Sequence, residues 1–284
     1  MLQDDSLGGQ AQAISRAAEW VRNADALLVT AGAGMGVDSG LPDFRGDEGL
    51  WRAYPALGAL QRGFQSMANP DAFRDDAQLA WGFYGHRLKL YRDVEPHRGF
   101  AVLRRWAALM QHGAFVYTSN VDGQFQKAGF SESGIVECHG SIHHFQCTTP
   151  CCAHIWPAAG FEPAVDESAC RMTGELPRCV QCGGLARPNI LMFWDHAWLE
   201  ERTERQMTRL QTWMGSGQRL VVVEIGAGTA LPTIRRFSER HAPRVVRINK
   251  REPQIDPRMG VGIRGGALET LLAIDTALNR RSVR

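Results

Sequence analysis

Four of the seven cysteines have the spacing of metal ligands. Cys147 and Cys151 are separated by three residues, and Cys179 and Cys182 by two, in a segment rich in Pro, His and Gly. Two such thiolate pairs are typical of a tetrahedral Zn²⁺ site. Cys152 is an alternative to Cys151, and the sequence leaves this choice open. Four thiolates leave no free coordination position, so we expect one structural zinc ion per chain rather than a catalytic one.

A glycine-rich stretch, TAGAGMGVDSGLPDFRG over Thr30–Gly46, directly follows the apolar run Ala26–Val29. Glycines let backbone N–H groups approach a phosphate closely, and Asp43, Phe44 and Arg45 stand where they would contact the rest of such a ligand. The stretch therefore favours dinucleotide binding. A turn without a ligand is the alternative.

Polar side chains also follow two later apolar runs. Asn120 and Asp122 come after the run in AFVYTSN, and His139 comes after the run in GIVECHG. Ligands of open α/β folds lie beyond the carboxyl ends of the strands, so these side chains are candidates for binding or catalysis. His139 suits a general base, with a purely structural role as the alternative. Asn120 and Asp122 are alternatively caps of a following helix.

The elements that must position these residues alternate between helix and strand. Apolar positions at helical spacing precede the run Ala26–Val29, and five further apolar runs follow it. These predicted strands lie in AFVYTSN, GIVECHG, NILMF, RLVVVEIGAG and PRVVRIN. Continuous apolar strands between polar or helical stretches predict an α/β fold with a doubly wound, Rossmann-like parallel sheet.

Two segments interrupt this alternation. Residues 47–95 are aromatic-rich and helical in pattern, and residues 145–186 contain six of the seven cysteines. We expect both to be insertions that together form a small domain, a helical and zinc-ribbon lobe. The nucleotide-binding domain is then expected to comprise residues 1–46, 96–144 and 187–284.

Composition excludes several classes of function. The 284 residues are 44% hydrophobic and 22% charged, which suits a globular chain with one sizeable core or one core and a small satellite. The formal net charge of +2 gives no strong field to attract nucleic acid or a membrane surface. The start MLQDDSLGGQ lacks the basic flank and apolar stretch of a secretory signal, and no apolar run approaches membrane-spanning length. We therefore expect a cytoplasmic protein without nucleic-acid or membrane partners. The odd number of cysteines also favours a reducing compartment such as the cytoplasm.

Taken together, these residues resemble the motifs of the sirtuin family. Gly32–Gly46, followed by GLW, resembles the family's glycine loop with its Pro-Asp-Phe-Arg-Gly step. Asn120–Asp122, His139 with its following glycine, and the paired cysteines resemble three further motifs in the same order. Later in the chain RPNILMF resembles the family's Arg-Pro strand, Gly226–Thr229 its second nucleotide loop, and Asn249 its adenosine-side asparagine. The resemblance spans nearly the whole chain.

The resemblance implies an NAD-dependent deacylase that acts on an acylated protein or a small acyl-lysine molecule. The acyl oxygen attacks the ribose carbon that carries nicotinamide, and the products are free lysine, nicotinamide and O-acyl-ADP-ribose. His139 is implied as the general base and Asn120 as a second catalytic residue, which holds the nicotinamide carboxamide together with Asp122. The implied NAD-binding residues are Gly32, Ala33, Gly34, Asp43, Phe44, Arg45, Ser119, Asn120, Asp122, Gly226, Gly228, Thr229 and Asn249.

Some positions depart from the family's pattern. Gly36, Ser119 and Ala230 stand where the family usually has Ser, Gln and Ser, and each change removes a polar contact to NAD. The implied substrate residue Phe193 is followed by Trp194, where the family has a glycine that lets a substrate backbone pair as an added strand. An ADP-ribosyltransferase, an NAD hydrolase and a non-enzymatic NAD sensor are the alternatives on the same scaffold.

The stretch WGFYGHR bears on the acyl group that is removed. Tyr84 and Arg87 are three positions apart, so they share one face of a helix. They resemble the Tyr-x-x-Arg of sirtuins that prefer succinyl, malonyl or glutaryl lysine, and an arginine beside a phenol suits a terminal carboxylate. We expect Tyr84 and Arg87 to bind an acidic acyl group. An exposed arginine beside a half-buried tyrosine is the alternative.

Overall fold

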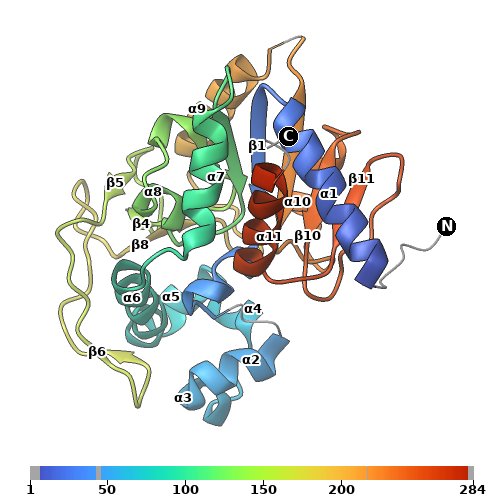
Figure 1. Ribbon diagram of the computed structural model, residues 1–284. Helices are drawn as coiled ribbons and strands as arrows, with labels where there is room; N and C mark the ends of the chain where they lie inside the picture. Colours follow the sequence, from blue (N-terminus) through green and yellow to red (C-terminus); the bar gives the residue numbers. More distant parts are fainter. Residues whose placement is uncertain (1–6, 43–45, 216, 281–284) are drawn as a thin grey trace.

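A computed structural model of the chain describes residues 7–42, 46–215 and 217–280. At its centre lies a parallel sheet of six strands in the order β11-β10-β9-β1-β2-β3 (Figure 1). The strands are β1 (Ala26–Ala31), β2 (Ala114–Thr118), β3 (Ile135–Glu137), β9 (Leu220–Ile225), β10 (Val245–Ile248) and β11 (Gly260–Ile263). Every neighbouring pair in this sheet is parallel.

Helices cover both faces of the parallel sheet. Successive side chains of a strand point to opposite faces, so Leu27 and Val29 of β1 join one hydrophobic cluster and Leu28 joins another. The helices that contribute to the first cluster are α1 (Leu7–Asn23), α7 (Arg98–Ala108), the short α8 (Gln124–Lys127) and α11 (Ala267–Arg280). Those that contribute to the second are α9 (Glu201–Trp213) and α10 (Thr233–Glu239). The predicted doubly wound α/β fold is confirmed.

The direction in which strands are added reverses between β1 and β9. From β1 the chain adds β2 and β3 on one side, and it later adds β9, β10 and β11 on the other. The two central strands pair from Ala26 with Leu220 to Ala31 with Ile225. Ligands of open parallel sheets bind beyond the carboxyl ends of the strands at such a reversal. The loops after β1 and β9 are therefore the expected position of a nucleotide.

One predicted strand belongs to a different sheet. The sequence places NILMF in the parallel sheet, but β8 (Ala186–Ile190) pairs antiparallel with β4 (Gly140–Cys147) in a separate sheet, which β5 (Trp156–Pro157) completes. The expectation is wrong because a short apolar run indicates burial and does not identify the pairing partner. Sequence analysis also missed β11, whose sequence GVGI contains two glycines that weaken the strand signal.

A third hydrophobic cluster lies away from the parallel sheet, at the lower left of Figure 1. It joins Trp81 of the helical segment to Met172 of the cysteine-rich segment and to Phe145 of β4. The helices of the first segment are α2 (Gly46–Ala53), α3 (Pro55–Ala59), α4 (Phe64–Met67), α5 (Asp71–Asp75) and α6 (Ala77–Asp93). The cysteine-rich segment adds the hairpin of β6 (Val165–Asp166) and β7 (Arg171–Met172). We call these elements, with β4, β5 and β8, the small lobe; the domain boundaries stay a prediction.

Helix α6 holds the two segments of the small lobe together. Asp76, at the start of the helix, accepts a hydrogen bond from the Leu79 N–H at 3.0 Å and pairs with Arg171 of β7 at 2.8 and 3.0 Å. Gly82 faces the cysteine-rich segment, and a Cβ there would lie 2.0 Å from the carbonyl oxygen of Cys170. Only glycine allows this approach, so α6 is fixed closely against the hairpin.

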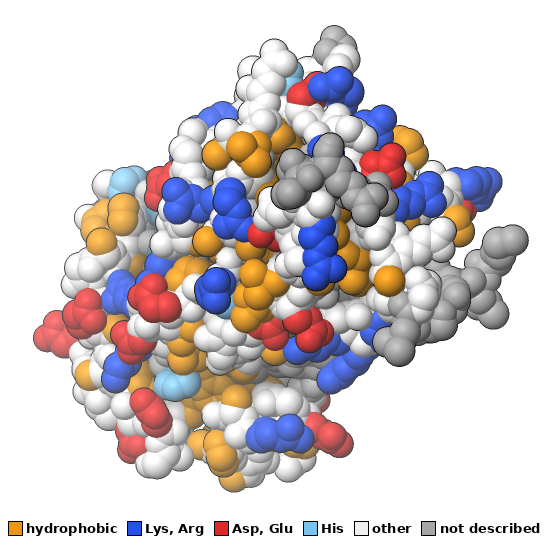
Figure 2. Space-filling model, in the orientation of Figure 1, with side chains coloured by type: hydrophobic (Ala, Val, Ile, Leu, Met, Phe, Trp, Pro, Cys, Tyr) orange, Lys and Arg blue, Asp and Glu red, His pale blue; other side chains and the backbone are white. Residues whose placement is uncertain are grey.

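Among the described residues, every helix is either too short or too polar to cross a membrane. On the face seen in Figure 2, basic and acidic side chains are interspersed rather than gathered into one patch. This distribution agrees with the formal net charge of +2.

Candidate functional site

The four predicted metal ligands converge in the structure. The sulfur atoms of Cys147, Cys151, Cys179 and Cys182 all lie within 4.8 Å of one another. Zn–S bonds of about 2.3 Å in a tetrahedron place the sulfurs about 3.8 Å apart. The Sγ–Sγ distances of 3.7 Å between Cys147 and Cys182 and 3.6 Å between Cys151 and Cys179 fit this geometry. Cys152 lies 3.6 Å from Cys151 but outside the converging set, so the structure favours Cys151.

Tight turns position the metal ligands. Cys147 is the last residue of β4, and Cys179 and Cys182 share a turn in which Gly183 donates its N–H to the Cys179 carbonyl at 2.9 Å. Gly183 has φ +72°, a left-handed conformation that suits glycine. His139 precedes the other end of β4, and eight strand residues span roughly 25 Å. With four thiolates as ligands, the zinc ion is structural.

The two predicted nucleotide loops meet backbone to backbone at the reversal between β1 and β9. The Gly34 N–H donates to the Gly226 carbonyl at 3.1 Å. A Cβ on Gly32 would lie 2.8 Å from the Gly226 oxygen, and one on Gly34 would lie 2.7 Å from the Gly226 Cα. Gly226 itself has φ +65°. Small loops that leave no room for side chains, at the carboxyl ends of central strands, fit the pyrophosphate of NAD.

Two predicted amide side chains fasten these loops. The Asn120 Nδ2 donates to the Gly32 carbonyl at 3.0 Å, and the Asn249 Nδ2 donates to the Ala227 carbonyl at 2.8 Å. The backbone of Ser119 also bonds to Ala31 at 3.1 Å. The structure therefore brings Ser119, Asn120 and Asn249 together with the glycine loops. Ala33, in the turn that follows Gly32, is exposed.

Asp122 is buried, two residues after Asn120. Its carboxylate accepts a hydrogen bond from the Gln124 N–H at 2.9 Å at the start of helix α8 (Gln124–Lys127), and its carbonyl lies 2.9 Å from the His143 Nε2. The capping alternative is thus realised in part. Burial raises the pKa of Asp122 to about 6, while the positive charge of Arg87 acts in the opposite direction. Asp122 is consequently ionised at neutral pH and available to accept a further hydrogen bond.

His139 follows β3 and is half-buried. Its carbonyl accepts the Leu191 N–H at 2.9 Å, which ties it to the end of β8. Two residues earlier, Glu137 pairs with Arg202 of α9 at 2.5 Å and is itself buried. Burial lowers the pKa of the His139 imidazole. The ring is therefore neutral at pH 7, the form in which it can accept a proton.

A residue after β10 that sequence analysis missed holds the second loop. The Glu252 carboxylate accepts hydrogen bonds from the Thr229 hydroxyl at 2.5 Å and from the Thr229 N–H at 3.2 Å. Arg235 bonds the carbonyls of Ala227 and Glu252, so it joins both sides of the loop. Glu252 follows Gly228 by 24 positions. An acidic residue at about this distance after a glycine loop is a known feature of dinucleotide-binding folds. This spacing could have identified Glu252 from the sequence.

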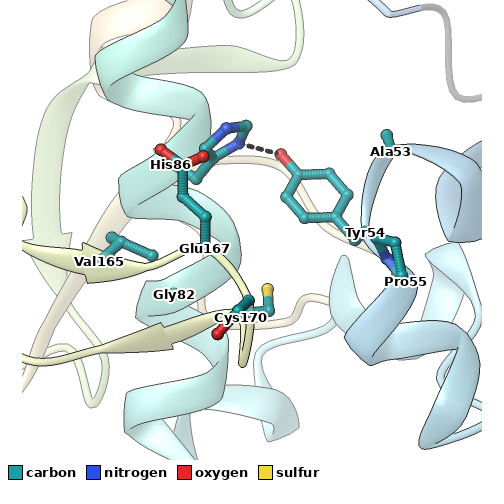
Figure 3. Close-up of a pocket in the computed structure, with 9 residues that line it drawn as sticks. Ala53, Tyr54, Pro55, Gly82, His86, Val165, Glu167 and Cys170 are labelled. Atoms are coloured by element: carbon teal, nitrogen blue, oxygen red, sulfur yellow. Dashed lines mark hydrogen bonds between the residues drawn. The ribbon is translucent and has the colours of Figure 1, made fainter.

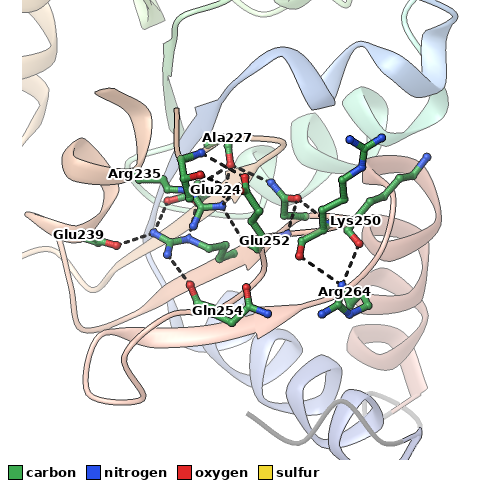
Figure 4. Close-up of polar contacts among 12 residues, drawn as sticks. Glu224, Ala227, Arg235, Glu239, Lys250, Glu252, Gln254 and Arg264 are labelled. Carbon is green, nitrogen blue, oxygen red and sulfur yellow. Dashed lines mark hydrogen bonds and ion pairs between the residues drawn. The ribbon is translucent and has the colours of Figure 1, made fainter. Parts of the chain in front are cut away.

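A buried ion pair joins the elements that flank the same loop. Arg247 of β10 contacts Glu224 of β9 at 2.6 and 3.0 Å and Glu239 of α10 at 2.8 Å (Figure 4). Both Arg247 and Glu224 are almost fully buried. The strands therefore carry a charge pair inside runs that read as apolar, and sequence analysis did not identify the partner across the sheet.

The predicted substrate residues lie in the small lobe and at its edge. Tyr84 and Arg87 are both buried on α6, with residue exposures of 1% and 7%, so the alternative of an exposed Arg87 is wrong. The N–H of Phe193 donates to the Ala68 carbonyl at 2.9 Å. Trp194 is 67% exposed and has φ +56°, a conformation that glycine usually occupies. The predicted NAD contacts Asp43–Arg45 lie outside the described residues.

A cavity of about 510 Å³ opens between α6, the end of α2 and the hairpin β6–β7 (Figure 3). The Tyr54 hydroxyl and the His86 Nδ1 meet at 2.8 Å at its wall. Gly82 and His86 line it from α6, and on a helix they face away from Tyr84 and Arg87. The cavity nevertheless borders this pair, because burial raises the pKa of its lining residue Tyr54 while the positive charge of Arg87 acts in the opposite direction.

Comparisons with known proteins point to one family. A model of the Sir2 family matches residues 32–223. An NAD-dependent protein deacylase of Pyrococcus furiosus is 31% identical over 259 residues, which cover 90% of this chain and 94% of that protein. The mitochondrial NAD-dependent protein deacylase sirtuin-5 of Canis lupus familiaris is 31% identical over 200 residues, or 64% of this chain and 61% of that protein. The solved structure of a Sir2 homolog–NAD complex has a TM-score of 0.67 at 22% identity and covers 94% of both chains, a likeness of fold.

Proposed function

The chain belongs to the Sir2 family and is an NAD-dependent protein deacylase, and we propose that it prefers lysines whose acyl group ends in a carboxylate, as succinyl and malonyl groups do. Its substrates are acylated proteins, and NAD is consumed as a co-substrate. The observation that carries the proposed preference is the buried guanidinium of Arg87, since a buried cation is suited to bind an anionic acyl group.

The polar residues at the carboxyl edge of the parallel sheet perform the chemistry in this proposal. NAD supplies the glycosidic bond that is broken, with nicotinamide as the leaving group. Asn120 and Asp122 orient the carboxamide of nicotinamide, and the two glycine loops hold the pyrophosphate. His139, neutral at pH 7, accepts a proton from the ribose hydroxyls. Phe193 contacts the substrate.

Arg87 lies in surroundings that strengthen its interaction with an anion. Its guanidinium carbon is 5.1 Å from the ring centre of Phe83 and 5.7 Å from that of Tyr84. Its charge also lowers the pKa of Asp122, so it acts on the residue proposed to bind nicotinamide. A hydrogen bond to a charged group contributes about 1.5–3 kcal/mol. An acetyl group has no carboxylate with which to make this bond.

The test compares kcat/KM for one peptide sequence that carries succinyl, malonyl or acetyl lysine. We expect the acidic groups to react ~10-fold faster or more, from the energy of one charge-assisted hydrogen bond. Arg87→Met removes the charge and should reverse the order, whereas Arg87→Lys keeps the charge without the planar fork and should fall between. An unchanged ratio in Arg87→Met would contradict the preference.

Mass spectrometry of the products tests the reaction itself. Deacylation yields O-acyl-ADP-ribose, whereas an ADP-ribosyltransferase modifies the acceptor and an NAD hydrolase releases free ADP-ribose. We expect O-acyl-ADP-ribose in step with nicotinamide. His139→Ala serves as the inactive control, because loss of one general base typically costs ~10²–10⁴ in rate.

A further inference from the structure

The buried face of α6 carries a row of aromatic residues with Arg87 among them. Phe83, Arg87 and Tyr91 are four positions apart in turn, and Tyr84 lies three before Arg87, so all four share one side of the helix. Their exposures are 0%, 7%, 5% and 1% in the order Phe83, Arg87, Tyr91, Tyr84. The guanidinium is therefore enclosed by rings of its own helix, and small shifts of these rings change where it points.

Tyr91 makes a directional contact with Arg87. Its hydroxyl oxygen accepts hydrogen bonds from the Arg87 Nε at 3.0 Å and from the Arg87 Nη2 at 2.8 Å. The guanidinium is planar, so two bonds along one edge fix both its position and its rotation. Burial raises the pKa of the Tyr91 phenol, which stays neutral at physiological pH. Tyr91 is therefore a neutral acceptor, and it leaves the positive charge of Arg87 intact.

Tyr91 also borders the region of Asp122. The two residues line one cavity of about 300 Å³, together with Ser141 and His143. The residue that holds Arg87 is thus next to the residue proposed to bind nicotinamide, where the acyl oxygen must react. A change in the direction of the guanidinium would alter how an acyl carboxylate is aligned at this point.

We propose that Tyr91 is a positioning residue that holds the Arg87 guanidinium and thereby sets the preference for acidic over neutral acyl groups. The inference rests on the proposed function, because it concerns the same acyl group. Tyr91 itself does not contact the acyl carboxylate. It acts by directing one edge of Arg87 to its phenol, so that the guanidinium is already oriented when a carboxylate arrives and little rotational freedom is lost on binding.

The test is Tyr91→Phe, which keeps the ring and removes only the hydroxyl oxygen. We expect KM for a succinyl-lysine peptide to rise ~5–10-fold with kcat nearly unchanged, the loss of one or two buried hydrogen bonds. Both constants for the acetyl-lysine peptide should stay as they are. Tyr117→Phe is the matched control, because it removes a buried phenol oxygen on strand β2, where the Tyr117 ring stacks on Phe237 with 3.7 Å between ring centres. The control should leave the succinyl-to-acetyl ratio unchanged.

A double variant separates positioning from a general loss of structure. If Tyr91 acts through Arg87, adding Tyr91→Phe to Arg87→Met should change the ratio no further. Additive effects would overturn the inference, and so would a wild-type ratio in Tyr91→Phe. If the wild-type enzyme shows no acidic preference, the proposed function fails and this inference with it. If the preference exists and is lost in Arg87→Met but kept in Tyr91→Phe, only the inference fails.

Discussion

The two glycine loops and the buried face of α6 are both tightly packed, but different parts of the chain do the packing. At the loops the contact is backbone to backbone, as the 3.1 Å bond from Gly34 to Gly226 shows. On α6 the contact is between side chains, with Arg87 held by the Tyr91 hydroxyl. A site built from backbone tolerates no added atom, whereas a site built from side chains changes with one substitution. At neutral pH, NAD binding is therefore expected to be robust to changes of packing in the small lobe, and acyl preference is expected to follow them.

Loss of the metal should produce the largest effect and confine it to one region. The four cysteines join the end of β4 to the turn at Cys179–Cys182. Thiolate ligation contributes folding energy, so Cys179→Ser or a strong chelator should unfold the small lobe and abolish activity. The parallel sheet has its own cores on both faces and should persist. Metal analysis, activity and hydrogen exchange of β1 and β9 measure the three outcomes.

Cys152→Ser is the matched control for the metal experiment. Its sulfur lies outside the converging set, so we expect one zinc ion per chain and full activity in this variant. Zinc loss in Cys152→Ser with retention in Cys151→Ser would transfer the ligand role to Cys152. Active wild-type protein without zinc would contradict the site as a whole.

A methyl group added at the glycine loops should reduce activity less than loss of the metal does, but it should still impair NAD binding severely. In Gly34→Ala the new Cβ would lie 2.7 Å from the Gly226 Cα. The atoms nearest to this Cβ all belong to the backbone of Gly226, which cannot rotate away, so the two loops must separate. Displacement of about 1 Å at a binding site costs ~10²-fold, which we expect as a rise in KM for NAD. The succinyl-to-acetyl ratio should not change, because α6 is untouched.

Gly134→Ala is the control for this substitution. A Cβ there would lie 3.5 Å from its nearest neighbour, the Ala114 carbonyl oxygen, which is an ordinary contact. We expect wild-type kinetics. If Gly34→Ala shifted the acyl ratio as strongly as KM for NAD, the two regions would be coupled and the contrast between them would be wrong.

The sequence predicted the backbone-built region better than the region built from side chains. Glycine at positions 32, 34 and 226, after apolar runs, predicts a tight turn by its residue type alone, because few other residues fit such turns. Cysteine spacing likewise identified the metal site. The predicted sheet for NILMF was wrong and β11 was missed, because strand pairing depends on residues far away in the chain.

Side-chain partners were beyond the reach of spacing alone. Tyr84 and Arg87 were assigned to one helical face, but nothing in the sequence distinguished Tyr91 as the acceptor for the guanidinium. Arg187 shows the same limit: it is fully buried and pairs with Asp195 at 2.8 Å, a partner that sequence analysis did not identify. Such contacts depend on rotamers and on a partner that only the fold supplies.

The smallest effect is expected from pH, and it tests the electrostatic link between the two regions. Burial raises the pKa of Asp122 to about 6, above the value near 3.9 of an unfolded chain. The unfolded state therefore releases this proton first, so folding stability decreases as pH rises from about 4 to about 6 and then levels off. If the ionised carboxylate binds nicotinamide, kcat/KM for NAD should fall about tenfold between pH 7 and pH 5.

Two variants separate the contributions to this pH profile. Protonation of His139 also lowers activity at acid pH. Asp122→Asn removes the carboxylate and leaves His139 in place. Any fall in kcat/KM that this variant still shows at acid pH is therefore due to His139. The charge of Arg87 holds the pKa of Asp122 down, so Arg87→Met should move the Asp122 limb to higher pH. NAD kinetics with the acetyl-lysine peptide, from pH 5 to pH 8, avoid the loss of succinyl binding. A limb that stays in place in Arg87→Met would mean that the nucleotide-binding edge does not sense the small lobe, because a buried carboxylate responds to the removal of a nearby cation.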